Sequence, residues 1–477
     1  MNDALISDVQ AGFTQLADQL RALLISSAPD QCLARLEQPI PMINLKGWLS
    51  HQTGAKKAYW RDRERECERA ALGRTWTREL YCRDDIEPAF QKARQLLDGL
   101  PADTGAQCFS YLSFSDHDSQ TWSSFGYGTV FLPLLECVET RRGTTLAINL
   151  YANSEDAWYK CIQQALALLA NIQFRQTLRN DFFQLQEPVY HPQRQKWQSL
   201  MSQALHSFSH HEMDKVVLSR EAVYGYRGHL SPWYLLQCWQ KANSQSYGFL
   251  FEGDNNEIFM GCSPEKLIKR QGNIITTEAL AGTTRRGASR DEDFQLEVLL
   301  MNDRKNIHEN QLVLNDIREK LSNLCRSLES DRSHSILKLK TIQHLRYLIR
   351  GVLKNKISDG QLINALHPTP AVGGSPRAVA CQFIDRHEPY NRGLYAGACG
   401  VVGIERSEFC VSIRSARLTP DSITLFAGAG IVQGSNSQDE WQELNNKIAT
   451  ILDIVQRLQS KPLIEESFLD VLCFGQV

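Results

Sequence analysis

The chain has 477 residues, of which 42% are hydrophobic and 22% are charged, and its formal net charge is -2. This composition is typical of a globular protein that buries a core without disulfides or metal ions. It lacks the charge excess by which proteins bind nucleic acids or membrane surfaces, so we expect a small-molecule partner, no nucleic acid and no membrane.

The N-terminus and the cysteines predict a cytoplasmic protein. The chain begins Met-Asn-Asp-Ala, without the basic and apolar regions of a secretory signal. No apolar run reaches the ~20 residues that span a bilayer. The 13 cysteines include no Cys-x-x-Cys pair, which favours scattered reduced thiols over disulfides or a zinc site.

Hydrophobic spacing predicts the elements of the first half. A three- and four-residue repeat predicts a helix over residues 5–24, and alternation predicts a strand over residues 145–151. Helical spacing returns over residues 155–180, and the polar, proline-containing run 186–196 is typical of a connector.

Strands and helices mix in the second half. Strand-like stretches fall at residues 215–220, 247–251, 258–261, 400–404, 410–417 and 423–427. Helical patterns fall at residues 294–321, 377–385 and 439–459, and residues 324–335 indicate a polar loop. The many turn signals between short strands predict an α+β fold rather than a doubly wound parallel sheet.

Lys215 lies in the β-branched run from Asp214 to Arg220. In a strand, Lys215, Val217 and Ser219 share one face. Burial beside valines would lower the pKa of the lysine and make its amine a base near neutrality. From this run alone, the favoured interpretation is a lysine on an edge strand, where its charge discourages aggregation.

Three glutamates occupy positions that are ordinary on their own. Glu265 ends the run Gly-Cys-Ser-Pro-Glu, in which the proline forces a turn and presents the carboxylate at a fixed place. Glu309 shares one face of the helix predicted at 294–321 with Lys305, and a solvated face is the usual interpretation. Glu309 and Glu443 are nevertheless a natural pair for Mg²⁺, which prefers oxygen ligands.

The last predicted helix follows a strand that contains glycines. The run Ala-Gly-Ala-Gly at 427–430 leaves backbone N–H groups uncovered, which suits an anion, but it does not complete the Gly-x-Gly-x-x-Gly of dinucleotide sites. Ser437 and Glu440 predict a capping box at the start of the helix. Glu440, Glu443 and Lys447 then fall on one side of it.

In this order, the clusters resemble the chorismate-utilising enzymes over residues 215–451, about half of the chain. No single segment is decisive, but the ordered set is specific. The segments are Lys215-Val-Val-Leu-Ser-Arg, Ser263-Pro-Glu265, Glu278-Ala-Leu-Ala-Gly-Thr, 305–310, Gln343-His344-Leu345, His367-Pro-Thr-Pro-Ala-Val-Gly-Gly, Ser412-Ile-Arg414-Ser-Ala, Ala427-Gly-Ala-Gly-Ile and Glu440-Trp-Gln-Glu443 with Lys447.

The resemblance implies an α+β fold in which a large antiparallel β-sheet sandwich is flanked by helices. Residues 1–195 would form an N-terminal α/β part of that fold, and residues 196–460 the chorismate-binding catalytic part. Residues 461–477 would form a C-terminal tail, apolar enough to dock on the body or on a partner.

Three positions indicate the branch of the family. Lys215 is similar to the lysine of members that add water rather than ammonia. Ala281 stands where aminodeoxychorismate synthases carry a nucleophilic lysine, and Ala371 where salicylate synthases tend to carry threonine. The resemblance therefore implies a magnesium-dependent isochorismate synthase whose reaction stops at isochorismate.

Residues 386–389 and 395–397 look most like those of the menaquinone-pathway members. A siderophore-pathway isochorismate synthase and a bifunctional salicylate synthase are the nearer alternatives. A non-catalytic chorismate-binding subunit is the distant one. The oligomeric state stays open between a monomer and a homodimer.

The resemblance also implies roles for individual residues. Lys215 would be the general base and Glu265 the general acid, with Glu309 and Glu443 as Mg²⁺ ligands and Glu440 acting on the metal through a water or a neighbouring ligand.

The substrate-binding residues would be His344, Tyr395, Arg414, Lys447 and the backbone N–H groups of Ala429 and Gly430. Some relatives carry an acidic residue where Asn306 stands, which leaves three carboxylates around the metal in this chain.

Overall fold

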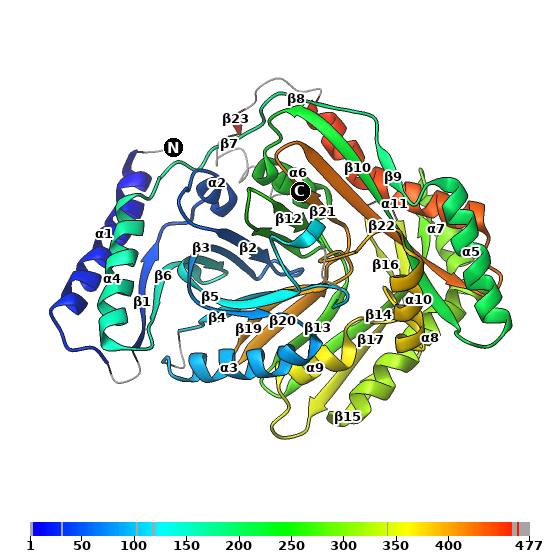
Figure 1. The fold of residues 1–477 in the computed structure, drawn as a ribbon, viewed down its shortest axis with the longest axis horizontal. Helices are drawn as coiled ribbons and strands as arrows, with labels where there is room; N and C mark the ends of the chain where they lie inside the picture. The colour runs from blue at the N-terminus through cyan, green and yellow to red at the C-terminus, as the bar shows by residue number, and fades with distance from the viewer. Residues whose placement is uncertain are drawn as a thin grey trace.

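The computed structural model describes residues 3–29, 32–101, 104–116, 120–340, 342–459 and 465–466 (Figure 1). Apart from residues 465–466, the predicted tail at 461–477 lies outside the described residues. Within the described ranges, no helix is both long and apolar enough to cross a membrane.

Two arms of antiparallel strands diverge from β5 (Gly128–Thr140) (Figure 1). The first arm runs through β3 (Cys67–Leu80), β2 (Lys57–Arg61), β11 (Gly248–Glu252), β12 (Ile258–Gly261), β21 (Ser415–Leu418), β22 (Ser422–Val432) and β10 (Lys215–Gly228). The second arm runs through β4 (Gln107–Leu112), β19 (Ala398–Gly403), β20 (Arg406–Val411), β13 (Lys266–Gln271), β14 (Ile274–Arg285) and β17 (Ile342–Leu353).

Shorter strands extend this frame. β6 (Gly143–Tyr151) and β1 (Leu33–Ile40) continue from β5, while β15 (Cys325–Ser330) and β16 (Ser335–Lys338) pair with β17. β18 (Gly374–Ser375), β9 (Val189–His191) and β8 (Phe183–Leu185) pair with β10, and β7 (Leu178–Arg179) pairs separately with β23 (Glu465–Glu466).

Helices cover the frame on several sides (Figure 1). α1 (Asp3–Leu24) and α4 (Glu155–Ala170) pack near β1 and β6, and α3 (Ile86–Asp98) packs on α9 (Asp359–Leu366) beside the second arm. α2 (Leu45–Ser50) packs on α6 (Pro232–Ala242), while α5 (Arg194–Ser209), α10 (Arg377–His387) and α11 (Ser437–Gln459) cover β10 and β22. α7 (Arg290–Asn302) and α8 (Arg304–Ser322) lie against β14, and α8 also reaches β22.

This architecture confirms the predicted α+β class, with a large antiparallel sheet flanked by helices. The predicted N-terminal helix, the strand at 145–151 and the helix at 377–385 are also confirmed, with ends shifted by a few residues. The helix predicted over 155–180 ends already at Ala170, and the predicted connector 186–196 contains β9 and the start of α5.

The single helix predicted over 294–321 is wrong. Asp303 has extended backbone angles, φ -77 and ψ 113, and separates α7 from α8. Its carboxylate accepts a hydrogen bond of 2.7 Å from the Asn306 backbone N–H, as an N-cap does. Hydrophobic spacing continues across the break, so only the capping geometry reveals it.

Three smaller predictions are also corrected. Residues 324–335 contain β15 and the start of β16 instead of a loop. Their side chains are largely polar, but pairing with β17 satisfies the hydrogen-bonding groups of their backbone. The strand predicted over 410–417 is divided at Arg414, whose φ of 50 ends strand geometry. Asn436 rather than Ser437 caps α11, since its side chain accepts the N–H groups of the following residues.

Two neighbouring crossovers connect the arms. One leads from β12 to β13, and the other returns from β20 to β21. The Cys262 N–H donates to the Arg414 carbonyl at 2.9 Å, and the Val411 N–H donates to the Glu265 carbonyl at 3.1 Å. The crossovers therefore hold Arg414 and Glu265 together where the arms face each other.

Candidate active site

A cavity lies between the ends of the arms. Strands β14, β17 and β22, helices α8 and α11 and both crossovers contribute to its wall. Ten of the predicted site residues line it: Glu265, Ala281, Glu309, His344, Ala371, Tyr395, Arg414, Gly430, Glu443 and Lys447. Lys215, Ala429 and Glu440 lie behind this lining.

Lys215 is buried at the end of the first arm. Its side chain is 0% exposed, and its Nζ lies 2.9 Å from Glu309 Oε1. β10 pairs with β22 on one side and with β18 on the other at this position. The edge-strand interpretation of this lysine is therefore wrong, because the amine is inside the molecule and beside a carboxylate.

Glu265 is 4% exposed and lies in the crossover after β12. Burial raises the pKa of its carboxyl group to about 8, and the neighbouring charge of Glu278 acts in the same direction. An acid with this pKa holds its proton at neutral pH. Glu265 can therefore act as a proton donor.

Two carboxylates face the cavity from different helices. Glu309 comes from α8 and Glu443 from α11, where Glu443 Oε1 lies 2.6 Å from the Nζ of Lys447. The described residues form no group of three or more histidine, cysteine, aspartate or glutamate side chains arranged to hold a metal. Two carboxylates still fit Mg²⁺, which commonly takes one or two from the protein and its other ligands from substrate and water.

Glu440 lies one turn before Glu443 on α11. It is 2% exposed, and its Oε1 accepts a hydrogen bond of 2.5 Å from Lys305 Nζ. Burial, and then the charge of Glu443, raises the pKa of the Glu440 carboxyl group. Its present partner is thus a lysine behind the cavity wall.

Gly430 leaves the space that the Lys215–Glu309 pair occupies. A Cβ at this position would lie 2.2 Å from Glu309 Oε1 and 3.3 Å from Lys215 Cε. The Val217 N–H donates to the Gly373 carbonyl and therefore not to β22. Hydrogen-bonded pairs alternate along antiparallel strands, so the next pair, Leu218 with Ala429, exchanges the hydrogen bonds between β10 and β22. The Ala429 N–H therefore serves the sheet, contrary to the prediction that it is uncovered, whereas the Gly430 N–H points away from β10.

Several positive or polar groups suit the carboxylates of a small acid. Arg414 is partly buried, and desolvation lowers its pKa to about 10, which leaves it charged at neutral pH. Lys447 Nζ donates to the Gly428 carbonyl at 2.7 Å. The Tyr395 ring stacks on Phe426 with centroids 4.9 Å apart.

Residues 18–456 match the family described as "Chorismate binding enzyme". The chain belongs to the chorismate-binding enzymes.

Two curated relatives are similar over nearly their full length. The isochorismate synthase MenF of Escherichia coli is 31% identical over 94% of this chain and 100% of its own. That of Haemophilus influenzae is 30% identical over 94% of this chain and 97% of its own.

Two solved structures share this fold. The solved structure of MenF, the menaquinone-specific isochorismate synthase from Escherichia coli, has a TM-score of 0.83 at 30% identity, over 93% of this chain and 100% of the other. Anthranilate synthase component I from Streptococcus pneumoniae shares the fold, with a TM-score of 0.62 at 19% identity over 90% of this chain and 93% of the other.

The remaining wall of this chorismate-binding enzyme is held by local hydrogen bonds. His344 Nδ1 lies 2.9 Å from Thr283 Oγ1, and burial lowers the pKa of the imidazole to about 3, so the ring is neutral. Asn306 Oδ1 accepts the Thr283 N–H at 3.2 Å, beside Gly282 with its φ of 77. Asn306 thus ties α8 to an irregularity in β14.

Sequence reasoning missed the surroundings of the general-acid candidate. Glu278 belongs to a recognised segment but received no role, and its partner Arg63 lies in the first half, where no motif pointed to it. No sequence pattern predicts an ion pair between two residues that lie so far apart in the chain.

Proposed function

We propose that this chorismate-binding enzyme is an isochorismate synthase, which isomerises chorismate to isochorismate. The observation that carries the proposal is the combination of an acid on the cavity wall and an amine directly behind it. Lys215 is a buried amine, and Glu265 is a buried acid that keeps its proton at neutral pH. Exchange of a hydroxyl group between two ring positions needs one base and one acid.

In the proposed reaction, neutral Lys215 takes a proton from a water molecule, whose oxygen bonds to C2 of chorismate. The ring double bonds shift, and the bond between C4 and its hydroxyl oxygen breaks. Glu265 gives its proton to that oxygen, which leaves as water. Return of a proton from Lys215 to Glu265 restores both groups, so one water is consumed and one released.

We propose that Glu309 and Glu443 hold Mg²⁺. When bound, Mg²⁺ would offset the negative charge of the ring carboxylate. Arg414, Tyr395 and Lys447 would orient the carboxylates of the substrate, with Arg414 suited to bidentate contact.

The neutral His344 ring would lie against the substrate ring. The Gly430 N–H is free of β10 and could serve the substrate, whereas that of Ala429 is not. Glu440 would act on the metal through water.

Ala281 and Ala371 support a reaction that stops at isochorismate. Neither methyl side chain can act as a nucleophile or exchange a proton, so no residue at these two positions would attack the ring. The names of the similar proteins support menaquinone biosynthesis as the pathway. We also propose that the enzyme works in the cytoplasm, with chorismate as its small-molecule partner.

The direct test is incubation of the purified chain with chorismate, with and without Mg²⁺, and separation of the products by chromatography. We expect isochorismate as the product, formed only with Mg²⁺. Appreciable salicylate and pyruvate would replace this proposal with a salicylate synthase. Binding of chorismate without any product would identify a non-catalytic subunit.

The raised pKa of Glu265 predicts the basic limb of the pH profile. The acid works in its protonated form, so kcat should fall as pH rises through about 8. Stopped assays across the range, with ionic strength held constant, measure this limb. An unchanged kcat well above that pH would remove Glu265 from the role of acid.

A further inference from the structure

A hairpin from the first half of the chain reaches the segment that carries Glu265. Arg63 lies in the turn between β2 and β3 and contacts the crossover, with its side chain 10% exposed. Arg63 Nη1 donates to the Pro264 carbonyl at 2.7 Å and to Glu278 Oε1 at 2.5 Å. Its Nη2 donates to Glu278 Oε2 at 3.1 Å.

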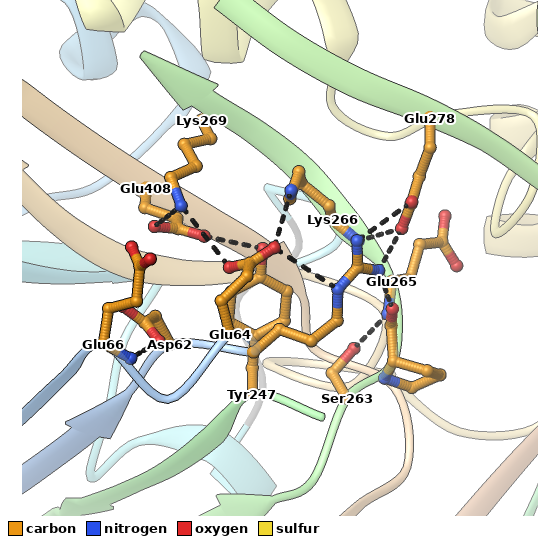
Figure 2. Close-up of polar contacts among 12 residues, drawn as sticks. Asp62, Glu64, Glu66, Tyr247, Ser263, Glu265, Lys266, Lys269, Glu278 and Glu408 are labelled. Atoms are coloured by element: carbon orange, nitrogen blue, oxygen red, sulfur yellow. Dashed lines mark hydrogen bonds and ion pairs between the residues drawn. The ribbon is translucent and has the colours of Figure 1, made fainter. Parts of the chain in front are cut away.

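Glu278 completes the contact from the other side. Its side chain is 0% exposed, and its Oε1 also accepts the Lys266 backbone N–H at 3.1 Å (Figure 2). Pro264 and Lys266 are the neighbours of Glu265 in the chain. One ion pair therefore holds the backbone on both sides of Glu265, and neither of its members lines the cavity.

We propose that Arg63 and Glu278 are positioning residues that fix where Glu265 presents its proton and set how tightly the proton is held. The inference rests on the proposed role of Glu265 as the general acid. It assigns part of that role to a hairpin of the N-terminal part, far from the cavity residues in sequence.

The charges around Glu265 predict the direction in which its pKa should change in each variant. Burial and then Glu278 raise the pKa of Glu265. Lys215, Lys447 and the Thr369 side chain act in the opposite direction. Removal of the Glu278 charge should therefore lower this pKa, and removal of the Arg63 charge, which compensates Glu278, should raise it.

The same hairpin offers a matched control. Glu66 is 41% exposed, and its carboxylate oxygens lie 3.7 Å from Arg141 Nη2 and 3.7 Å from Arg406 Nη1. It bonds to neither backbone group that the Arg63–Glu278 pair holds. Glu66→Gln removes one charge from the hairpin and should leave both kcat and its pH limb unchanged.

The experiment compares kcat against pH for Glu278→Gln, Arg63→Gln and the double variant. We expect the basic limb to move down by roughly one pH unit in Glu278→Gln and up by a similar amount in Arg63→Gln. The double variant should return towards the wild-type limb. Because the Glu265 carboxyl group is no longer held in place, kcat should fall by on the order of 100-fold in the single variants, with KM little changed.

Arg63→Lys separates position from charge. Lysine keeps the positive charge but lacks the planar fork of N–H groups by which Arg63 bonds Pro264 and both Glu278 oxygens. The kcat of this variant should fall, while the basic limb of its pH profile stays at the wild-type position. Thermal unfolding checks that each variant is folded. The proposal is overturned if the basic limb of the kcat profile stays at the same pH in both Glu278→Gln and Arg63→Gln. It is also overturned if the limb moves in the same direction in both variants.

An infrared titration keeps the inference separate from the proposed function. The carboxyl band of Glu265, obtained as the difference between the wild type and Glu265→Gln, reports its protonation without turnover. Opposite shifts of this band in Glu278→Gln and Arg63→Gln support the inference even if no chorismate is converted. Absence of such shifts in a protein that makes isochorismate refutes the inference alone.

Discussion

Replacement of Lys215 by alanine should lower kcat by about 1,000-fold, within the range that general base catalysis contributes. No other amine takes its place, because Lys447 is held by Glu443 and the Gly428 carbonyl. KM should change little, since Lys215 lies behind the cavity lining. Product formation at saturating chorismate and Mg²⁺ measures the effect.

Two controls make the Lys215→Ala result specific. Lys269→Ala removes a lysine that is 17% exposed and outside the cavity, and should leave turnover unchanged. Added propylamine should restore part of the activity of Lys215→Ala, increasingly at pH values where the free amine is present. Full turnover in Lys215→Ala without added amine would show that the base lies elsewhere.

Glu309→Gln should weaken Mg²⁺ binding by at least about 100-fold, because the amide is neutral and offers the metal no anionic oxygen. The contact of 2.9 Å between Lys215 Nζ and the Glu309 side chain is altered at the same time. Isothermal titration with Mg²⁺ measures the affinity without turnover, and activity against Mg²⁺ concentration gives a second value.

Glu319→Gln is the matched control for this prediction, since Glu319 lies on the same helix and is exposed. Its Mg²⁺ affinity should equal that of the wild type. Normal affinity in Glu309→Gln would remove this residue from the metal site and leave Glu443 without its proposed partner.

The sequence predicted the type of fold and most residues of the cavity. Ten predicted residues line one space because the recognised segments end at the two crossovers, on facing strands and on α8 and α11. Local breaks were harder to predict. Asp303 interrupts a continuous hydrophobic pattern, and residues 324–335 form strands that only pairing with β17 stabilises.

The glycines of the 427–430 run show a second limit. Their spacing suggested N–H groups open to an anion, but the Ala429 N–H is used by the sheet. The space beside Gly430 is filled by Glu309 and Lys215, which come from α8 and β10. A sequence gives no measure of the distance between such residues.

Residue types and their order were determined by the sequence alone: an amine, an acid and two carboxylates in the pattern of a chorismate-binding enzyme. Only the tertiary structure decided their states. It buried Lys215 against Glu309, raised the pKa of Glu265 and brought Arg63 into contact with the backbone next to the general acid. Protonation and pairing depend on burial and on distances through space, and these exist only once distant parts of the chain have packed together.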